Sequence, residues 1–177
     1  MKATGIVRRI DDLGRVVIPK EIRRTMRIRE GDPLEIYTDR DGEVIFKKYS
    51  PAGEMLEEAQ GYCDTLQKSS ALSVVVSDRD VIIAAAGVSK KECLEKKTPP
   101  EMDKLMDQRR LYTYQSGTPR IALGPDGYFI SAMMPILSEG DVVGAVASIK
   151  SDVREVPEAE RMLIQTAGLY LGRQMET

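Results

Sequence analysis

Eight basic side chains, seven of them arginines, lie within residues 8–29 of this 177-residue chain, together with only three acidic ones. The arginines include Arg8, Arg15, Arg23 and Arg24. A guanidinium group is planar and donates two parallel hydrogen bonds to a phosphate or to the major-groove edge of guanine. The balance of 8 positive against 3 negative charges therefore indicates an anionic partner such as nucleic acid. The alternative interpretation is a solvated charged surface.

The positive charge is confined to the start of the chain. Residues 1–50 carry 12 Lys and Arg against 9 Asp and Glu, whereas the other 127 residues carry 14 against 19. The whole chain has a net charge of −2. Because the acidic remainder repels polyanions, we expect an anionic partner to be bound through the first fifty residues alone.

Composition also excludes much familiar catalysis. The chain contains no histidine, which removes imidazole-based nucleophile activation, proton transfer and metal binding. Cys63 and Cys93 form no CxxC motif, and we expect both to be buried packing residues. The sequence therefore predicts no catalytic residue, no metal site, no cofactor and no enzyme activity.

The hydropathy pattern indicates a cytoplasmic protein. The sequence contains no apolar run long enough to span a membrane and no signal-peptide pattern. We therefore expect no membrane association.

The arginines need elements to position them, and the first fifty residues predict a hairpin, a short helix and a second hairpin. We expect strands at 4–10 and 14–18 around a turn at 11–13, a helix over 20–28 after Pro19, and strands at 34–38 and 44–48. Helical spacing places one stripe of basic residues opposite Ile22 and Met26. That stripe consists of Lys20, Arg23, Arg24 and Arg27.

A unit of this size hides too little apolar surface to be comfortably stable alone. Two copies that interleave their hairpins into one closed barrel would bury the apolar faces and remove exposed strand edges. We therefore expect residues 1–50 to form a homodimer.

The residues at 11–24 match the ordered pattern D-x-L-G-R-V-V-I-P-x-E-[IL]-R-R. This stretch and its flanks resemble the AbrB-type swapped-hairpin DNA-binding domain of bacterial transition-state regulators. The resemblance implies a homodimeric barrel that binds double-stranded DNA, with recognition depending on DNA shape as well as on phosphate contacts. It also implies which arginines contact DNA: Arg8, Arg15, Arg23 and Arg24.

Each of these arginines also has a purely structural interpretation. Arg8 alternates with Ile6 and Ile10, so the stem of its side chain could be buried. Arg15 could serve only to stabilise the turn after Gly14. Arg23 and Arg24 could pair with nearby carboxylates, either within the chain or on a partner subunit.

A domain boundary is expected at 51–53, where Pro, Ala and Gly follow the second hairpin. An amphipathic helix from Glu54 to about Lys68 follows, to pack either on its own downstream domain or on the same helix of another subunit. The predicted organisation is a head at 1–50, a linker helix within 51–70 and a second domain at 71–177.

The second domain alternates strands and helices around an antiparallel sheet. We expect strands at 72–77, 81–86, 128–137 and 141–150, with a polar loop over 112–127. Helices are expected at 89–96, where Ser89 and Glu92 have capping-box spacing, and at 101–109 and 157–175. The whole chain is thus predicted to be an α+β protein of two domains.

This element order, with the closing sequence PILSEGDVVGAVASI, resembles a GAF domain, the small-molecule sensor module of many bacterial regulators. The resemblance implies a pocket between the sheet and the middle helices, a small-molecule effector, and association through helices that makes a homotetramer. The N-K-x-F-x-D-E signature of cyclic-nucleotide binders is absent, so the sequence favours no particular ligand. Polar candidates for such a pocket are Lys90, Arg109, Arg110, Tyr112, Tyr114, Arg120 and Tyr128.

An AbrB-type head joined to a GAF-like domain resembles a family of forespore regulators that activate and repress genes late in sporulation. Two alternatives stay open. AbrB-like heads also occur in antitoxins, which usually end in a disordered tail that wraps the toxin. Some GAF folds are methionine sulfoxide reductases that use pocket cysteines, and here only Cys63 and Cys93 are present.

Overall fold

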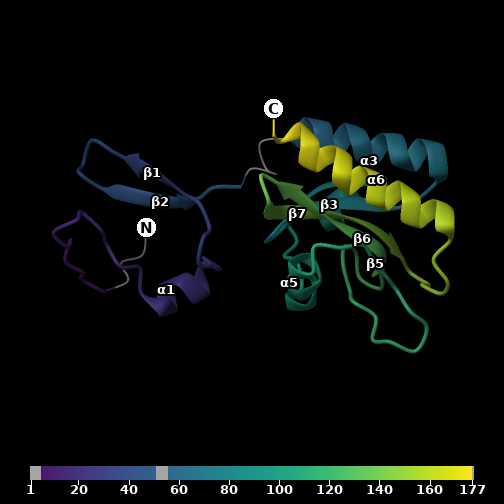
Figure 1. Ribbon diagram of the computed structural model, residues 1–177, viewed down its shortest axis with the longest axis horizontal. Coiled ribbons are helices and arrows are strands. Elements are labelled where there is room, and N and C mark those ends of the chain that lie inside the picture. Colours follow the sequence, from purple (N-terminus) through teal and green to yellow (C-terminus); the bar gives the residue numbers. More distant parts are fainter. Residues whose placement is uncertain (1–4, 51–55, 177) are drawn as a thin grey trace. The chain divides into compact units, whose positions relative to one another are not determined.

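A computed structural model describes residues 5–50 and 56–176 and divides the chain into two compact units, Met1–Tyr49 and Ser50–Thr177 (Figure 1). The expected boundary at 51–53 lies outside the described residues. The first unit contains helix α1 (Lys20–Thr25) and strands β1 (Leu34–Thr38) and β2 (Val44–Lys48). Both strands are confirmed at their predicted bounds.

Strands β1 and β2 form an antiparallel hairpin in which Leu34 lies opposite Lys48 and Thr38 opposite Val44. The Asp39 carboxylate closes the connection, because its Oδ1 accepts hydrogen bonds from the backbone N–H groups of Asp41 at 3.0 Å and Glu43 at 2.9 Å. Asp is favoured in such turns for this interaction with the backbone.

Helix α1 ends earlier than the sequence predicts. The prediction of helix to residue 28 is wrong because Arg27 adopts a left-handed conformation, with φ of 52°. The backbone N–H of Ile28 then donates to the carbonyl of Arg23 at 2.8 Å, and that of Arg27 to Arg24 at 3.3 Å. These are the two hydrogen bonds of a Schellman helix end. Arg27 therefore leaves the predicted basic stripe.

The predicted strands at 4–10 and 14–18 do not form within residues 5–18 of the single chain, and residue 4 is outside the described part. The turn between them does form, closed by hydrogen bonds from Asp11 N to Arg15 O and from Gly14 N to Asp11 O. An isolated two-stranded hairpin is marginal in water without a packed apolar face. Here Val7 is 89% exposed, and no such face is covered.

Exposed apolar side chains are the rule in the first unit. Among residues 5–50 only Pro19 is buried. The exposed large apolar side chains are Ile6, Val7, Ile10, Leu13, Val16, Val17, Met26, Ile36, Tyr37, Val44, Ile45 and Phe46. We call this set the apolar surface of the head.

The second unit is a five-stranded antiparallel sheet with helices on both faces (Figure 1). The strands are β3 (Val74–Asp78), β4 (Ile82–Ala86), β5 (Tyr112–Thr113), β6 (Phe129–Ser138) and β7 (Asp141–Lys150), in the order β4-β3-β7-β6-β5. The helices are α3 (Leu56–Ser70), α4 (Lys90–Cys93), α5 (Pro100–Asp107) and α6 (Glu158–Gln174).

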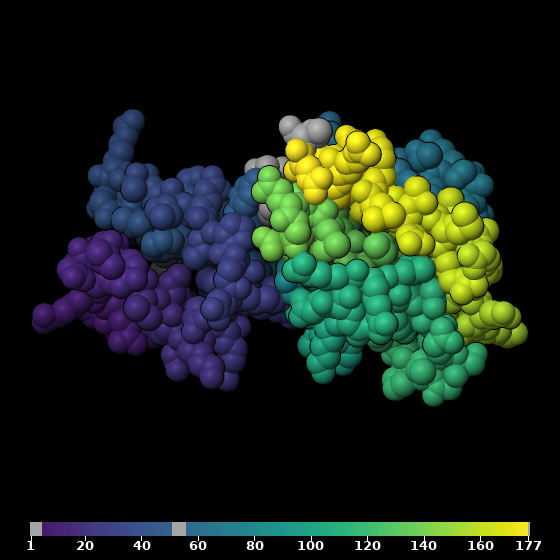
Figure 2. Space-filling view, in the orientation of Figure 1, coloured from purple at the N-terminus to yellow at the C-terminus, as the bar shows by residue number. Residues whose placement is uncertain are grey.

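Helices α3 and α6 lie side by side on one face of the sheet. Ala59, Cys63 and Leu66 of α3 are buried in the same cluster as Ile164 and Leu171 of α6. Of the two predicted packing partners for this first helix, its own downstream domain is the one observed. Figure 2 shows the outer side of α6, in yellow, lying open along the surface of the unit.

Helix α6 is attached to the sheet near both of its ends. Its buried Glu160 accepts a hydrogen bond from Ser148 Oγ at 2.7 Å and forms an ion pair with Lys150 Nζ at 2.5 Å, both residues being on β7. At its other end, a Cβ at Gly168 would overlap the side chain of Met134, and one at Gly172 would overlap the carbonyl oxygen of Leu137. The helix lies this near to β6 because two glycines present no side chain there.

The other face of the sheet carries α4, α5 and the loop before β6. Met102 and Met106 of α5 are buried against Ile82, Ile130 and Met133 of the sheet. Apolar side chains of α5 therefore pack directly on this face of the sheet.

The predicted helix at 89–96 is reduced to the four residues of α4. Ser89 makes no side-chain cap, so the predicted capping box is wrong. The chain instead returns to the sheet edge, where Glu95 N donates to Ile82 O and Ile82 N donates to Lys96 O, each at 2.9 Å. This pairing ends the helix, because Glu95 takes a φ of 64° to reach the strand.

Candidate nucleic-acid interface

The turn that precedes α1 holds Arg15 in a defined position. Gly14 has a φ of 77°, in the left-handed region that lets the chain reverse within three residues. Asp11 Oδ1 accepts hydrogen bonds from the backbone N–H groups of Leu13 at 3.0 Å and Arg15 at 2.7 Å. Asp11 Oδ2 accepts a further hydrogen bond from Arg15 Nε at 2.8 Å.

This arrangement fixes the charge of the turn. The hydrogen bonds donated by the backbone and the guanidinium of Arg15 lower the pKa of the Asp11 carboxyl below its ordinary value. Asp11 is therefore ionised at neutral pH. The side chain of Arg15 is still 70% exposed and remains accessible to an anion.

Arg23 and Arg24 lie in the last turn of α1. Arg24 is exposed, whereas Arg23 is half-buried and its Nε makes no hydrogen bond in the part of the chain that the structure describes. Within residues 5–50, neither guanidinium forms an ion pair with Glu21 or Glu30. The intrachain pairing considered from the sequence is thus not observed.

Arg8 lies in the irregular segment before the turn and is exposed, as are Ile6 and Ile10 on either side of it. The four predicted DNA-contacting arginines therefore come from three places in the head. They are the approach to the turn, the turn itself and the end of α1. That they contact DNA stays a prediction.

Sequence reasoning missed one polar residue of this region. Asp11 was interpreted only as a turn residue, although its separation of four residues from Arg15, across a glycine, is the spacing that lets a carboxylate reach back to a guanidinium. The signal was present in the D-x-L-G-R pattern.

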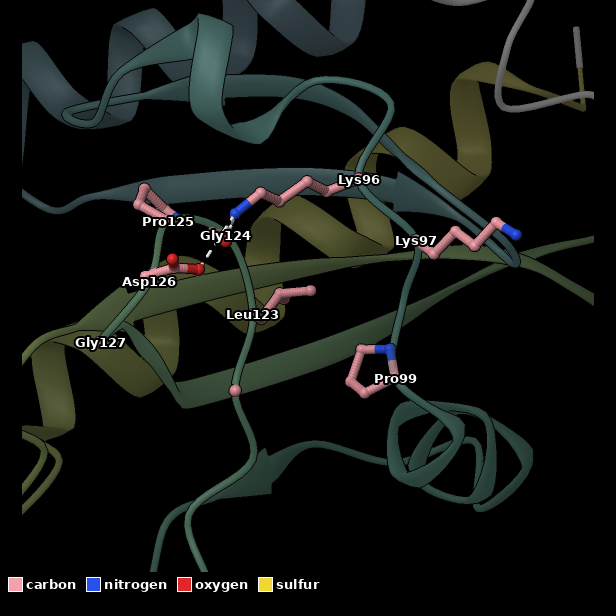
Figure 3. A pocket seen from close by; sticks show the side chains of 9 residues that line it. Lys96, Lys97, Pro99, Leu123, Gly124, Pro125, Asp126 and Gly127 are labelled. Carbon is pink, nitrogen blue, oxygen red and sulfur yellow. Dashed lines mark hydrogen bonds and ion pairs between the residues drawn. The ribbon is translucent and has the colours of Figure 1, made fainter.

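The second unit has a depression of about 390 Å³ between residues 96–99 and the loop 122–127 (Figure 3). Lys96 Nζ crosses it and donates to Gly124 O at 3.0 Å, with Asp126 Oδ1 at 3.5 Å. The ammonium group of Lys96 is thus held by oxygen atoms of the loop opposite.

None of the seven polar candidates proposed from the sequence lines this depression. Lys90 approaches Asp64 at 3.8 Å, and Arg120 approaches Asp152 at 3.5 Å and lies over the ring of Phe129. Tyr114 is buried in the cluster beneath α3 and α6. Arg109 and Arg110 are exposed, and Tyr112 and Tyr128 are half-buried against the other cluster.

Both cysteines are buried and free. Burial raises the pKa of the Cys63 thiol to about 12, and burial also raises the pKa of Cys93. A thiol must ionise to act as a nucleophile, so neither environment favours thiol chemistry. Among the described residues there is no cluster of three His, Cys, Asp or Glu side chains that could hold a metal.

Comparison with known proteins decides the family. The profile of a family described as "Stage V sporulation protein T C-terminal, transcription factor" matches residues 54–176. Stage V sporulation protein T of Bacillus subtilis is 51% identical over 178 aligned residues, covering 99% of each chain. The chain belongs to the stage V sporulation protein T family. Members of this family are transcription factors of sporulation, as the resemblance of the head motif and the second domain implied.

The head of this stage V sporulation protein T homologue is AbrB-like. The transition state regulatory protein AbrB of Bacillus subtilis is 65% identical over 51 residues, which are 29% of this chain and 52% of that relative. The profile of the family "Antidote-toxin recognition MazE, bacterial antitoxin" matches residues 7–54. The MazE match covers the basic segment and the hairpin of β1 and β2.

The second unit has the GAF fold. The crystal structure of the GAF domain from the Acinetobacter phosphoenolpyruvate-protein phosphotransferase aligns with a TM-score of 0.56 at 10% identity, covering 68% of this chain and 81% of that one. At this identity the likeness shows the fold alone. The predicted α+β architecture, an AbrB-like head joined to a GAF-like domain, is confirmed. The described helices include none that is long and apolar enough to cross a membrane.

Proposed function

We propose that this chain regulates transcription by docking the arginines of a dimeric head on promoter DNA. In this proposal Arg8, Arg15, Arg23 and Arg24 contact double-stranded DNA, and the protein activates some sporulation genes and represses others. The observation that carries it is the exposed guanidinium of Arg15, held on an ordered turn in the most basic segment of the chain. An immobilised guanidinium loses less freedom when it binds a phosphate or a base edge.

The second copy in the dimer is supported by the apolar surface of the head. In a stable monomeric domain these side chains would be covered, and a set of twelve exposed ones exceeds the scattered residues of an ordinary surface. The segments 5–10 and 14–18, where the sequence predicts strands, form no strand within the single chain. A second copy of the same head supplies both the apolar cover and the neighbouring strands.

A tetramer is supported by the outer sides of α3 and α6. Leu56, Met162, Leu169 and Tyr170 are exposed there, and the ring of Tyr170 stacks on that of Tyr62 at 5.2 Å. We propose that this surface pairs with its copy in another dimer, so that one tetramer carries two DNA-binding heads. Linked heads raise the effective concentration at neighbouring sites.

The remaining expectations follow from the same proposal. The protein binds DNA with its own side chains and without a cofactor, in the cytoplasm, with the forespore as the compartment that its family implies. A small-molecule effector acts only if it binds the DNA-competent arrangement with a different affinity from the other arrangement. The folded second unit favours a regulator over an antitoxin, because antitoxins of this kind usually end in a disordered tail.

The test is a salt titration of full-length protein on a library of promoter duplexes. A dimer that neutralises roughly six to eight phosphates gives a log K against log salt slope of about −5 to −7. We expect selective enrichment with this slope for the wild type, and loss of both in the Arg15→Ala/Arg24→Ala double variant.

Arg40→Ala provides the matched control, because it removes one exposed arginine of the head outside the basic segment. It should retain enrichment, and thermal unfolding should show that every variant is folded. Weak, unselective binding that the double variant leaves unchanged would refute the proposal.

A further inference from the structure

Asp11 is an acidic side chain in the middle of the most basic segment of the chain. A carboxylate near a DNA-binding surface repels phosphates, so its presence there calls for a reason. Its Oδ1 accepts two backbone N–H groups and thereby closes the turn. Its Oδ2 makes a separate contact, the 2.8 Å hydrogen bond and ion pair with Arg15 Nε.

The second contact orients the guanidinium. A guanidinium group has five N–H donors in one plane, and this one uses its Nε–H on Asp11. The terminal nitrogens are left as a pair for a bidentate acceptor. The Asp11 carboxylate, 36% exposed, lies behind the group it orients.

We propose that Asp11 is a positioning residue, which aims the free edge of Arg15 so that the head distinguishes its preferred DNA from other duplexes. This inference rests on the proposed function, because it requires that Arg15 contact DNA. It adds a second role to a residue that otherwise closes a turn. The contact is directional and is therefore a source of selectivity rather than of general attraction.

The Asp11→Asn variant distinguishes a role of Asp11 through its negative charge from a role in positioning Arg15, because the two roles predict different changes in DNA binding. The asparagine side-chain oxygen still accepts the N–H groups of Leu13 and Arg15, so the turn is retained, but the amide nitrogen cannot accept from Arg15 Nε. If Asp11 acted only through its charge, its neutralisation would tighten binding to all DNA. If Asp11 positions Arg15, the preference for the enriched duplex over a random duplex falls, by about 5-fold or more for one misaligned bidentate contact.

The experiment is a competition titration of the full-length protein between its most enriched promoter duplex and a duplex of random sequence. It compares the wild type with Asp11→Asn, Arg15→Ala and the double variant. Asp12→Asn is the matched control, with the same charge change one residue away. We expect Asp11→Asn to lower the preference while Asp12→Asn raises affinity for both duplexes.

The double variant tests whether Asp11 acts through Arg15. We expect Asp11→Asn to change the preference in the wild type and to have no further effect when Arg15 is already alanine. An effect of the same size in both backgrounds would overturn the proposal, as would equal behaviour of Asp11→Asn and Asp12→Asn.

The positioning role of Asp11 and the DNA-binding role of Arg15 are distinguished by different outcomes. If Arg15→Ala lowers the preference and Asp11→Asn does not, the positioning role is wrong and the DNA-binding role of Arg15 stands. If Arg15→Ala itself leaves the preference unchanged, Arg15 does not read DNA and both are wrong. Unfolding temperatures close to that of the wild type show that the turn survives in each variant.

Discussion

Glu160 is a buried carboxylate that connects the first turn of α6 to β7, and only 3% of the residue is exposed. It contacts Ser148 Oγ, which is itself hydrogen bonded to the backbone of Ala132 on β6. Its partner Lys150 is nearer to the surface. A buried charge held by one cation and one hydroxyl is costly to leave without either contact.

We predict that Glu160→Gln lowers the free energy of unfolding by about 2–4 kcal/mol, because the substitution leaves the ammonium of Lys150 without its carboxylate. Thermal and urea unfolding of the full chain measure the effect. Glu158→Gln is the matched control, since Glu158 is 68% exposed and pairs with Arg161 at the surface. It should change stability by less than about 0.5 kcal/mol. Equal losses in the two variants would contradict a structural role of the buried pair.

At the scale of elements, the hairpin between β6 and β7 contains a residue that is poorly suited to its backbone. Glu139 and Gly140 have φ values of 49° and 86°, the pattern of a type I′ turn. Asparagine and glycine are preferred at these two positions, and glutamate at the first is strained. The side chain of Glu139 is exposed, so a replacement disturbs no core contact.

We predict that Glu139→Asn stabilises the second unit by about 0.5–1 kcal/mol, which is roughly 1–4 °C in unfolding temperature for a protein of this size. Differential scanning calorimetry measures it. Glu139→Gln, which removes the same charge without the turn preference, should give no comparable gain. An equal gain in both variants would assign the effect to charge.

Elements with local signals were predictable. Strand β2 and the Asp39 turn follow from alternation and turn chemistry, and β7 was predicted at its observed bounds. The failures came from residues whose conformation depends on distant contacts. Arg27 ends α1 in a left-handed conformation, although the sequence has no glycine at this position to indicate a helix end. Glu95, which follows α4, pairs with β4 instead of continuing the helix.

The candidate site divides in the same way. Arg15 and its turn follow from a contiguous motif, whereas the depression beside Lys96 is built by two loops that are separate in sequence. The seven polar candidates were chosen by residue type alone, and they therefore include no residue that lines this depression. Strands were expected at 4–10 and 14–18, but within residues 5–18 the single chain supplies no neighbouring strand to pair them.

At the scale of the whole molecule, the proposed tetramer makes a prediction about mass and affinity together. Leu169 is 58% exposed on the outer side of α6, and Leu169→Glu introduces a charge that would be desolvated in a helix interface. We predict that this variant sediments as a dimer and that its affinity for promoters with two sites falls about 10-fold or more through lost avidity. Analytical ultracentrifugation and the salt titration measure the two effects.

Gln108→Glu is the control for that experiment, because it adds a charge at an exposed position at the end of α5, on the opposite face of the sheet. It should keep the tetramer if the interface centres on the apolar residues. A tetramer that survives Leu169→Glu would place the contact between dimers elsewhere.

Gly168 and Gly172 bring α6 so near to β6 that the helix cannot slide or roll on the sheet without meeting backbone. The Glu160 pair holds the other end of the same helix. The sheet and helix α6 therefore move as one rigid body. A load on the outer side of α6 is thus carried by the whole second unit rather than absorbed by a shift of the helix on the sheet.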